Sequence, residues 1–414
     1  MPNGDNWQGD VLRDLRAGAQ QGAPQGAQQQ SAQPPGGQAA DAPAAGQGLQ
    51  AQTVQTPAVA HGHAAPHQGV RGVQGVHQGG FAQGAGRQGH AQQGPAAATG
   101  HTSNGAGRAP DSRPVVDAAL AAAGRTPRHG EPLASRAVRT VRRIVSSSAA
   151  REVAEATRTA EVLQQPVTTG RQIAVTSIRG GAGKSTVAAL LGTAYAHYRQ
   201  DPVLLVEADP ALGSLPLRLG AETLRWTTGD VAGIVEPQMS LLDVTGYLVQ
   251  LPDNAWLLPG SQGQIGAMLD ARAYQRVMVA LRRYFGVTVV DCETLPAEVA
   301  RVALSAAQAR VLTAPATLEG VASTYAVLQW MQGLPPHLIS GTVVVLTELA
   351  PHARLDIDEA ARKLMSTGAS VQTLPYDRHL AAGGAIRTEL LAHSTRQAAT
   401  RLAADVFQLS QKRH

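Results

Sequence analysis

The chain has one cysteine, few aromatic residues and no long apolar run. Its 414 residues are 3% aromatic, and Cys292 is the single thiol, so no disulfide can form within the chain. No apolar run reaches the roughly 18 to 20 residues that span a bilayer, and the first residues lack the charged and apolar regions of a secretory leader. These absences argue against a disulfide-stabilised secreted fold and a membrane-spanning fold, and we expect a cytoplasmic protein.

Lysine is also scarce. It occurs only at Lys184, Lys363 and Lys412, whereas arginine is abundant, a bias typical of GC-rich coding. The formal net charge of +5 permits contact with acidic partners or nucleic acid without establishing either. Lys184 is therefore a lysine retained in a background that favours arginine.

Residues 1–113 are rich in Gly, Gln, Ala and Pro, with almost no clustered aliphatic side chains. Such a composition cannot offset the entropy of ordering, so it predicts a long disordered N-terminal region. Histidines here, including His61, His63 and His67, could form a metal-binding tract. The absence of nearby carboxylates and thiols favours a solvated tail instead.

Residues 5–17 differ from the rest of this tail. Trp7, Val11 and Leu15 recur at helical spacing. The pattern predicts a short amphipathic helix that docks into a groove of a partner protein. The alternative is that these residues simply belong to the tail.

Arginine and alanine dominate residues 125–168. Apolar side chains recur there three or four positions apart, at Val138, Val141, Ile144 and Val145. This spacing predicts an amphipathic helix with a basic face, followed by a second helix from Ala150. Such a basic helical segment could meet DNA phosphates, anionic lipid or an acidic protein, or be a solvated face beside the next domain.

The stretch QIAVTSIRGGAGKST, residues 172–186, places glycines between an apolar run and a helical pattern. Backbone N–H groups of such a loop converge on a polyphosphate, and the helix N-terminus adds its positive dipole end. A linker turn is the alternative, but the flanking strand and helix patterns disfavour it. The candidate phosphate-binding residues are Gly180, Gly181, Ala182, Gly183, Lys184, Ser185 and Thr186. Lys184 would meet the outer phosphates, and the Ser185 hydroxyl would bind Mg²⁺.

Strand and helix patterns alternate over residues 171–410, which predicts an α/β domain with a mostly parallel sheet and helices on both faces. The apolar run at 202–208 ends at Asp209, and the run at 285–290 ends at Asp291. A carboxylate at the C-terminal end of such a strand is suited to the Mg²⁺ shell. We assign that role to Asp291, the alternative being an N-cap for the helix that starts near Pro296.

The glycine loop departs from the ordinary Walker A pattern because Ile178 replaces its first glycine. It resembles instead the deviant loop KGGxGK[ST] of the ParA/MinD superfamily of dimerising ATPases, with Arg179 in place of the family's lysine. The resemblance implies a P-loop NTPase fold of the SIMIBI class, ATP and Mg²⁺ as cofactors, and a homodimer with ATP. It further implies that Arg179 reaches the phosphates of the facing subunit and that Asp209 orients the attacking water.

Besides Arg179, two further positions differ from that family pattern. Glu207 stands where the family carries the first aspartate of a DxD switch. Together with Arg179, this departure makes an ATP-binding switch with weak or absent hydrolysis one of the hypotheses that the resemblance implies. Thr347 stands where many members place an asparagine that reads adenine, which leaves base selectivity open.

The C-terminal run LPYDRHLAAGGAIRTELLAHSTRQAATRLAADV, residues 374–406, resembles EspI-like proteins associated with type VII secretion. The resemblance covers about 132–406 and implies an ATP-dependent dimerisation switch linked to secretion or its regulation. A component of the secretion apparatus, or another protein, would bind the N-terminal tail.

Two other classes remain. One is a DNA-binding partition or positioning ATPase, and the other is a degenerate, non-hydrolysing localisation scaffold. The last residues, FQLSQKRH, lack a sustained apolar face, so we expect no stable membrane insertion.

Overall fold

The computed structural model describes residues 109–412 apart from five gaps, which are 124–126, 139–147, 212, 265 and 352–354. The disordered region predicted for 1–113 lies, except for its last five residues, outside the described residues. The helix predicted at 5–17 lies outside them entirely. The described residues belong to one compact unit.

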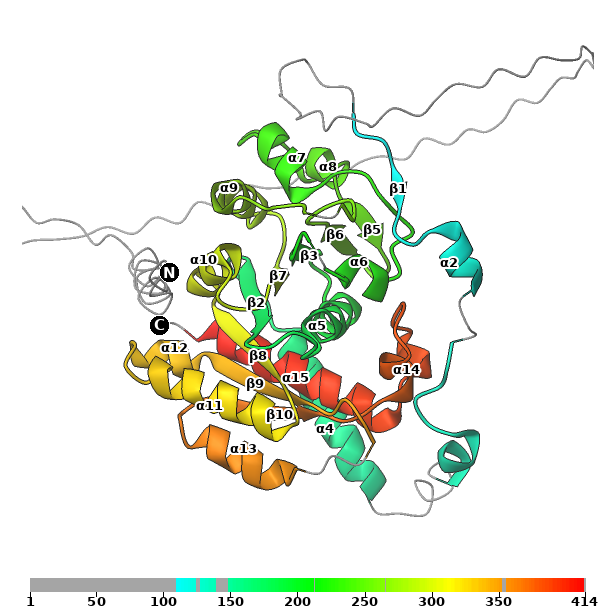
Figure 1. Cartoon of the computed structure of the whole chain (residues 1–414), viewed down its shortest axis with the longest axis vertical. Coiled ribbons are helices and arrows are strands. Elements are labelled where there is room, and N and C mark those ends of the chain that lie inside the picture. Colours follow the sequence, from blue (N-terminus) through cyan, green and yellow to red (C-terminus); the bar gives the residue numbers. More distant parts are fainter. Residues whose placement is uncertain are drawn as a thin grey trace, which may run out of the picture. The chain divides into compact units, whose positions relative to one another are not determined.

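A mostly parallel sheet dominates this unit (Figure 1). Its strands are β2 (Arg171–Ser177), β3 (Val203–Ala208), β5 (Val249–Leu251), β6 (Ala255–Leu258), β7 (Val287–Cys292), β8 (Ala309–Pro315), β9 (Thr342–Thr347) and β10 (Ser370–Leu374). They lie in the order β10-β9-β8-β2-β7-β3-β6-β5. All neighbours pair in parallel except β5 and β6, which form an antiparallel edge hairpin.

Helices cover both faces of the sheet. They are α2 (Ala118–Ala123), α4 (Ser148–Leu163), α5 (Lys184–Tyr198), α6 (Leu215–Arg218), α7 (Thr228–Ile234), α8 (Leu241–Thr245), α9 (Ala271–Leu281), α10 (Glu298–Ala306), α11 (Leu318–Met331), α12 (Pro336–Ser340), α13 (Ile357–Met365), α14 (Arg378–Ala381) and α15 (His393–Gln411), with a 3₁₀ turn at Thr388–Leu390. The predicted α/β fold is confirmed. No helix among the described residues is long and apolar enough to cross a membrane.

The central strands are apolar on both faces because each face lies under helices. Along β2, Ala174 packs into one core with Leu204, while Ile173 and Val175 pack into the opposite core with Leu205. The alternation follows from the twofold repeat of a strand.

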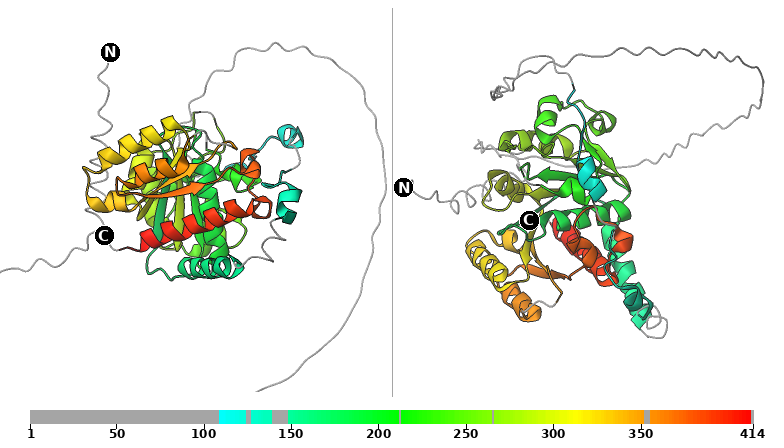
Figure 2. Two further views of the ribbon diagram at one scale, coloured as in Figure 1. Left: turned by 90° about the horizontal axis from the view of Figure 1, so that it is seen from below. Right: turned by 45° about the vertical axis from the view of Figure 1, so that its right-hand side comes forward.

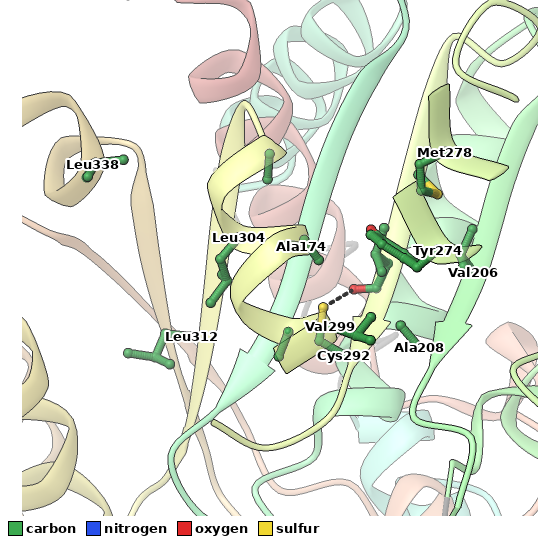
Figure 3. Packing of buried hydrophobic residues seen from close by; sticks show 14 of the residues in the cluster. Ala174, Val206, Ala208, Tyr274, Met278, Cys292, Val299, Leu304, Leu312 and Leu338 are labelled. Atoms are coloured by element: carbon green, nitrogen blue, oxygen red, sulfur yellow. Dashed lines mark hydrogen bonds between the residues drawn. The ribbon is translucent and has the colours of Figure 1, made fainter. Parts of the chain in front are cut away.

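The first core lies beneath α9, α10 and α11. Figure 3 shows Tyr274 and Met278 of α9 on the same side of the sheet as Val206 and Cys292, with Val299 of α10 close by. Cys292 is fully buried in this core, so its thiol is a packing group.

The second core lies beneath α5 and α15. The Tyr195 hydroxyl of α5 donates to the Ala403 carbonyl of α15 at 2.9 Å, and the Tyr195 and Phe407 rings lie 6.1 Å apart. Helix α4 lies beside α15 (Figure 2). Its last carbonyl, at Leu163, accepts from the buried Arg199 at 2.7 Å.

Helix α4 includes the second helix predicted from Ala150. It contacts α15 through polar pairs, since Glu152 lies against His393 and Glu155 lies 3.4 Å from Arg401. Its last residue, Leu163, is fully buried in the second core. A cavity of about 430 Å³ lies among α4, α5 and α15. Of the first predicted helix, residues 133–138 are helical, and residues 139–147 lie outside the described residues.

The chain that precedes α4 lies on the domain. Strand β1 (Arg113–Pro114) pairs antiparallel with β4 (Thr223–Leu224), and the N–H of Gly130 donates to the Leu390 carbonyl at 2.7 Å. We call residues 109–116, which include β1, the strap.

Replacing Gly192 of α5 with alanine should destabilise the fold, because a Cβ there would lie 2.2 Å from Leu205 Cδ2. We expect a loss of about 1–3 kcal/mol in the free energy of unfolding, measured by urea denaturation. The matched control is Gly233→Ala in α7, where a Cβ meets nothing within 4 Å. That change should be neutral or stabilising by up to about 1 kcal/mol. Equal effects of the two substitutions would contradict the packing of α5 on β3.

Candidate functional site

The glycine loop joins the C-terminal end of β2 to α5. Gly181 and Gly183 have φ angles of 74° and 81°, a region that glycine adopts readily. Gly183 is the N-cap of α5, and no side chain caps this helix. A Cβ at Gly180 or Gly181 would meet nothing within 4 Å. The loop therefore presents backbone N–H groups and a helix N-terminus to open space, an arrangement suited to an anion.

Thr347, at the end of β9, lies beneath this loop. Its hydroxyl is 3.1 Å from the Ala182 carbonyl and 3.2 Å from the Ala314 carbonyl. The Ser177 hydroxyl also donates to the Arg179 carbonyl at 2.8 Å. Because Thr347 is 4% exposed, its role in this structure is to order the loop, and nothing places it against a base.

Lys184 is the first residue of α5. Its Nζ donates to the Thr294 hydroxyl at 3.2 Å, beyond the end of β7. Thr294 was not among the site residues predicted from the sequence, although it lies only three residues after Asp291. The ammonium group thus lies between the glycine loop and the β7 end.

Asp291 lies within β7 and is fully buried. Neither of its carboxylate oxygens has a hydrogen-bond partner. Burial raises the pKa of Asp291 to about 7, and the Ser185 hydroxyl and the Lys184 ammonium group lower it by less. The N-cap alternative is wrong, because the cap position of the following helix is Ala297.

Glu207 lies opposite Asp291 in the register of β3 and β7. Its Oε2 accepts the Gly260 N–H at 3.1 Å, while Oε1 has no partner. Burial raises the pKa of Glu207 to about 8, the Gly260 N–H lowers it, and the negative charges of Asp291 and Asp209 raise it further. Glu207 is therefore largely a neutral acid at pH 7, and it holds the backbone that follows β6.

Asp209 follows β3 at the same edge of the sheet and is half-buried. Its charge contributes to raising the pKa values of Glu207, Asp291 and Glu293. The structure thus brings Asp209, Asp291, Lys184 and Ser185 to one place. Thr186 is the third residue of α5.

Arg179 is half-exposed and is held by α11 of its own chain. Its Nε donates to the Ser323 hydroxyl at 2.9 Å, and its guanidinium lies 3.8 Å from the Glu319 carboxylate. Sequence reasoning identified neither partner. Their i, i+4 spacing at the start of α11 places them on one face, but only the sheet order shows that this face meets the loop.

The donor set fits a polyphosphate with Mg²⁺. Mg²⁺ commonly binds one or two carboxylates and completes its shell with water and phosphate oxygens. Asp291 offers two buried oxygens that no protein group satisfies, and Ser185 lies close enough to lower the pKa of Asp291. Among the described residues no cluster of three or more His, Cys, Asp or Glu could form an all-protein metal cage.

Comparison with known proteins gives one family and several relatives. The CobQ/CobB/MinD/ParA nucleotide binding domain matches residues 173–382, about half of the chain. The ESX-1 secretion-associated protein EspI of Mycobacterium tuberculosis is 29% identical over 229 residues, which are 53% of this chain and 34% of EspI. The septum site-determining protein MinD of Thermotoga maritima is 34% identical over 124 residues, which are 30% of this chain and 44% of MinD. The match thus spans about a third of EspI and less than half of MinD.

Solved structures with a similar fold include a ParA family ATPase from Chlorobium tepidum, with a TM-score of 0.48 and 16% identity, covering 56% of this chain and 98% of that one. Another is MinD from Pyrococcus horikoshii complexed with Mg-ADP, with a TM-score of 0.46 and 21% identity, covering 58% of this chain and 98% of that one.

The buried carboxyl groups predict how stability depends on pH. Because the pKa values of Glu207 and Asp291 rise from 4.5 and 3.8 to about 8 and about 7 on folding, the folded chain binds protons that the unfolded chain has lost. Their contribution is full below about pH 4 and disappears as pH rises through the folded pKa values. Without metal or nucleotide, the free energy of unfolding should fall between about pH 5 and pH 8.

Urea denaturation of a Glu207→Gln/Asp291→Asn double variant tests this. The slope of stability against pH should flatten in this variant and stay unchanged in the exposed control Glu389→Gln. The same slope in wild type and double variant would show that these two groups do not set it.

Proposed function

The chain belongs to the CobQ/CobB/MinD/ParA nucleotide-binding family, and we propose that it is an ATP-binding protein that changes its association state with the bound nucleotide. The observation that carries the proposal is the combination of an open glycine loop at an uncapped helix N-terminus with the buried, unpartnered carboxylate of Asp291. A solvated linker turn would have no reason to lie against a buried carboxyl group, since removing such a group from water is costly.

In this proposal each residue has one task. The N–H groups of Gly180 to Gly183 and the first turn of α5 bind phosphate oxygens, and Lys184 supplies a positive charge to the outer phosphates. Ser185 and Asp291 would hold Mg²⁺, which neutralises charge on the phosphate oxygens. Asp209 orients a water molecule and accepts its proton as general base.

Arg179 is the residue proposed to act between two copies of the chain. Its guanidinium is half-exposed, and its partners on α11 are themselves at the surface, with Glu319 80% exposed. Exposed pairs of this kind contribute little to stability, so the side chain can leave α11 at small cost. A homodimer in which Arg179 meets the phosphates of the facing subunit is therefore compatible with its contacts here.

The proposed link to type VII secretion is carried by the similarity to EspI alone. Because the match spans about a third of EspI, the link concerns only the matched part of the two proteins. Its test is complementation: wild type, but not Lys184→Ala, should restore secretion in cells that lack the chain. Equal restoration by both would separate any secretion role from nucleotide binding.

Replacement of Lys184 with alanine should weaken ATP binding by the full-length chain by about 10- to 100-fold, because a charge-assisted contact is lost. Asp209→Asn should keep ATP affinity and lower turnover about 100-fold or more. Isothermal titration and phosphate release measure the two effects. The control Lys363→Ala lies on α13, where Lys363 Nζ lies 4.8 Å above the Tyr325 ring, and should change neither. Equal ATP affinity in wild type and Lys184→Ala would overturn the proposal.

Arg179→Ala should leave ATP affinity within about threefold and abolish ATP-dependent association, measured by sedimentation velocity with ATP and with ADP. The matched control is the exposed Arg272→Ala on α9. A dimer of Arg179→Ala as stable as that of wild type would contradict the role across the interface.

A salt-sensitive, ATP-dependent shift of DNA by wild type would instead favour the DNA-binding positioning ATPase.

A further inference from the structure

The strap is tied to the domain by hydrogen bonds to β4 and its neighbouring residues. Besides the β1–β4 pairing, the Val115 N–H donates to the Glu222 carbonyl at 2.9 Å. The Arg225 Nε donates to the Pro110 carbonyl at 3.0 Å. Residues 111–114 are exposed, so these contacts are mostly polar.

Gln262 connects the strap to the loop that follows β6. Its side-chain amide nitrogen is 3.0 Å from the Asp111 carbonyl and 2.6 Å from the Arg225 carbonyl. An amide nitrogen carries two protons, so it can donate to both at once. One side chain therefore bridges the strap, the residue after β4 and the loop 259–263.

The loop 259–263 in turn holds the segment that carries Asp209. The Ser261 hydroxyl is buried and donates to the Pro210 carbonyl at 2.6 Å, and the Gly260 N–H donates to Glu207. Pro210 is adjacent to Asp209, and Glu207 is two residues before it. Three consecutive residues, Gly260 to Gln262, thus connect the strap to Glu207 and Pro210, which lie on either side of Asp209 in the sequence.

Close packing makes this connection stiff. A Cβ at Gly260 would lie 2.8 Å from the Glu207 carbonyl oxygen, and a Cβ at Gly213 would lie 2.3 Å from the Asp209 carbonyl oxygen. The backbone around Asp209 therefore has little room to move while the loop 259–263 stays in place.

We propose that the strap is a positioning element for Asp209: while it is docked, Gln262 and Ser261 hold the Asp209 segment for turnover, and release of the strap loosens that segment. Residues 111–114 of the strap are exposed and β1 pairs over two residues, so the strap can open locally without global unfolding. A protein partner that withdraws the chain preceding residue 109 would then slow turnover. The inference rests on the proposed function only for the role of Asp209.

Hydrogen–deuterium exchange of the full-length chain without nucleotide tests the coupling. Gln262→Glu keeps the size of the side chain but replaces the donating amide with an acceptor. Losing these bonds should raise exchange over residues 207–215 between about twofold and tenfold, with no change over α15. The control is Gln264→Ala, an exposed glutamine that directly follows the loop 259–263. Faster exchange of the strap with unchanged exchange over 207–215 would overturn the inference.

Kinetics separate positioning from a purely structural effect. Gln262→Glu should lower kcat for ATP severalfold and leave KM unchanged, because the glycine loop is not touched. Gln262→Lys restores a donor and should recover part of both kcat and protection from exchange. If exchange changes as expected but wild type neither binds nor hydrolyses ATP, the proposed function fails and the coupling stands. A lower kcat with unchanged exchange over 207–215 would also overturn the inference.

Discussion

Two carboxyl groups are buried side by side at one end of the sheet, and the architecture of the site depends on how each is compensated. Glu207 and Asp291 face each other in register on adjacent strands, and both are buried. Two like charges cannot both ionise in such a place without compensation. Burial raises the pKa values of both groups. Glu207 also accepts the Gly260 N–H, whereas Asp291 lies beside the Ser185 hydroxyl and the Lys184 ammonium group, at the place where a bound cation would compensate its charge further.

The different environments of the two carboxyl groups explain why the chain has Glu207 where the family pattern has an aspartate. Glutamate in place of the family's first aspartate suggested weakened hydrolysis. In the structure the longer side chain reaches the backbone after β6, so Glu207 holds a loop. Asp209 lies outside this buried pair and is half-buried rather than enclosed. The substitution therefore alters how the switch segment is anchored, and by itself it gives no reason for the loss of a water-orienting carboxylate.

Most of the fold was readable from the sequence because its signals are local. Runs that are apolar on both faces predicted the parallel strands, and glycines between a strand and a helix predicted the loop at 180–183. The contacts of Thr347 and Gln262 were not readable, since they depend on which strands are neighbours. Thr347 reaches Ala182 from β9 although β8 lies between β9 and β2. No spacing in the sequence encodes that pairing.

The chain before β2 cannot be treated as a separate attachment to the nucleotide-binding domain. It meets the domain at the strap, again where Gly130 donates to Leu390, and again along α4. At the strap and at Gly130 the contacts are hydrogen bonds, which exchange with water at small net cost, whereas α4 is anchored by the buried Leu163. The strap can therefore be released by modest binding energy while α4 stays in place. Because the strap is the part closest to the long N-terminal region, it is also the first part that a partner bound there would displace.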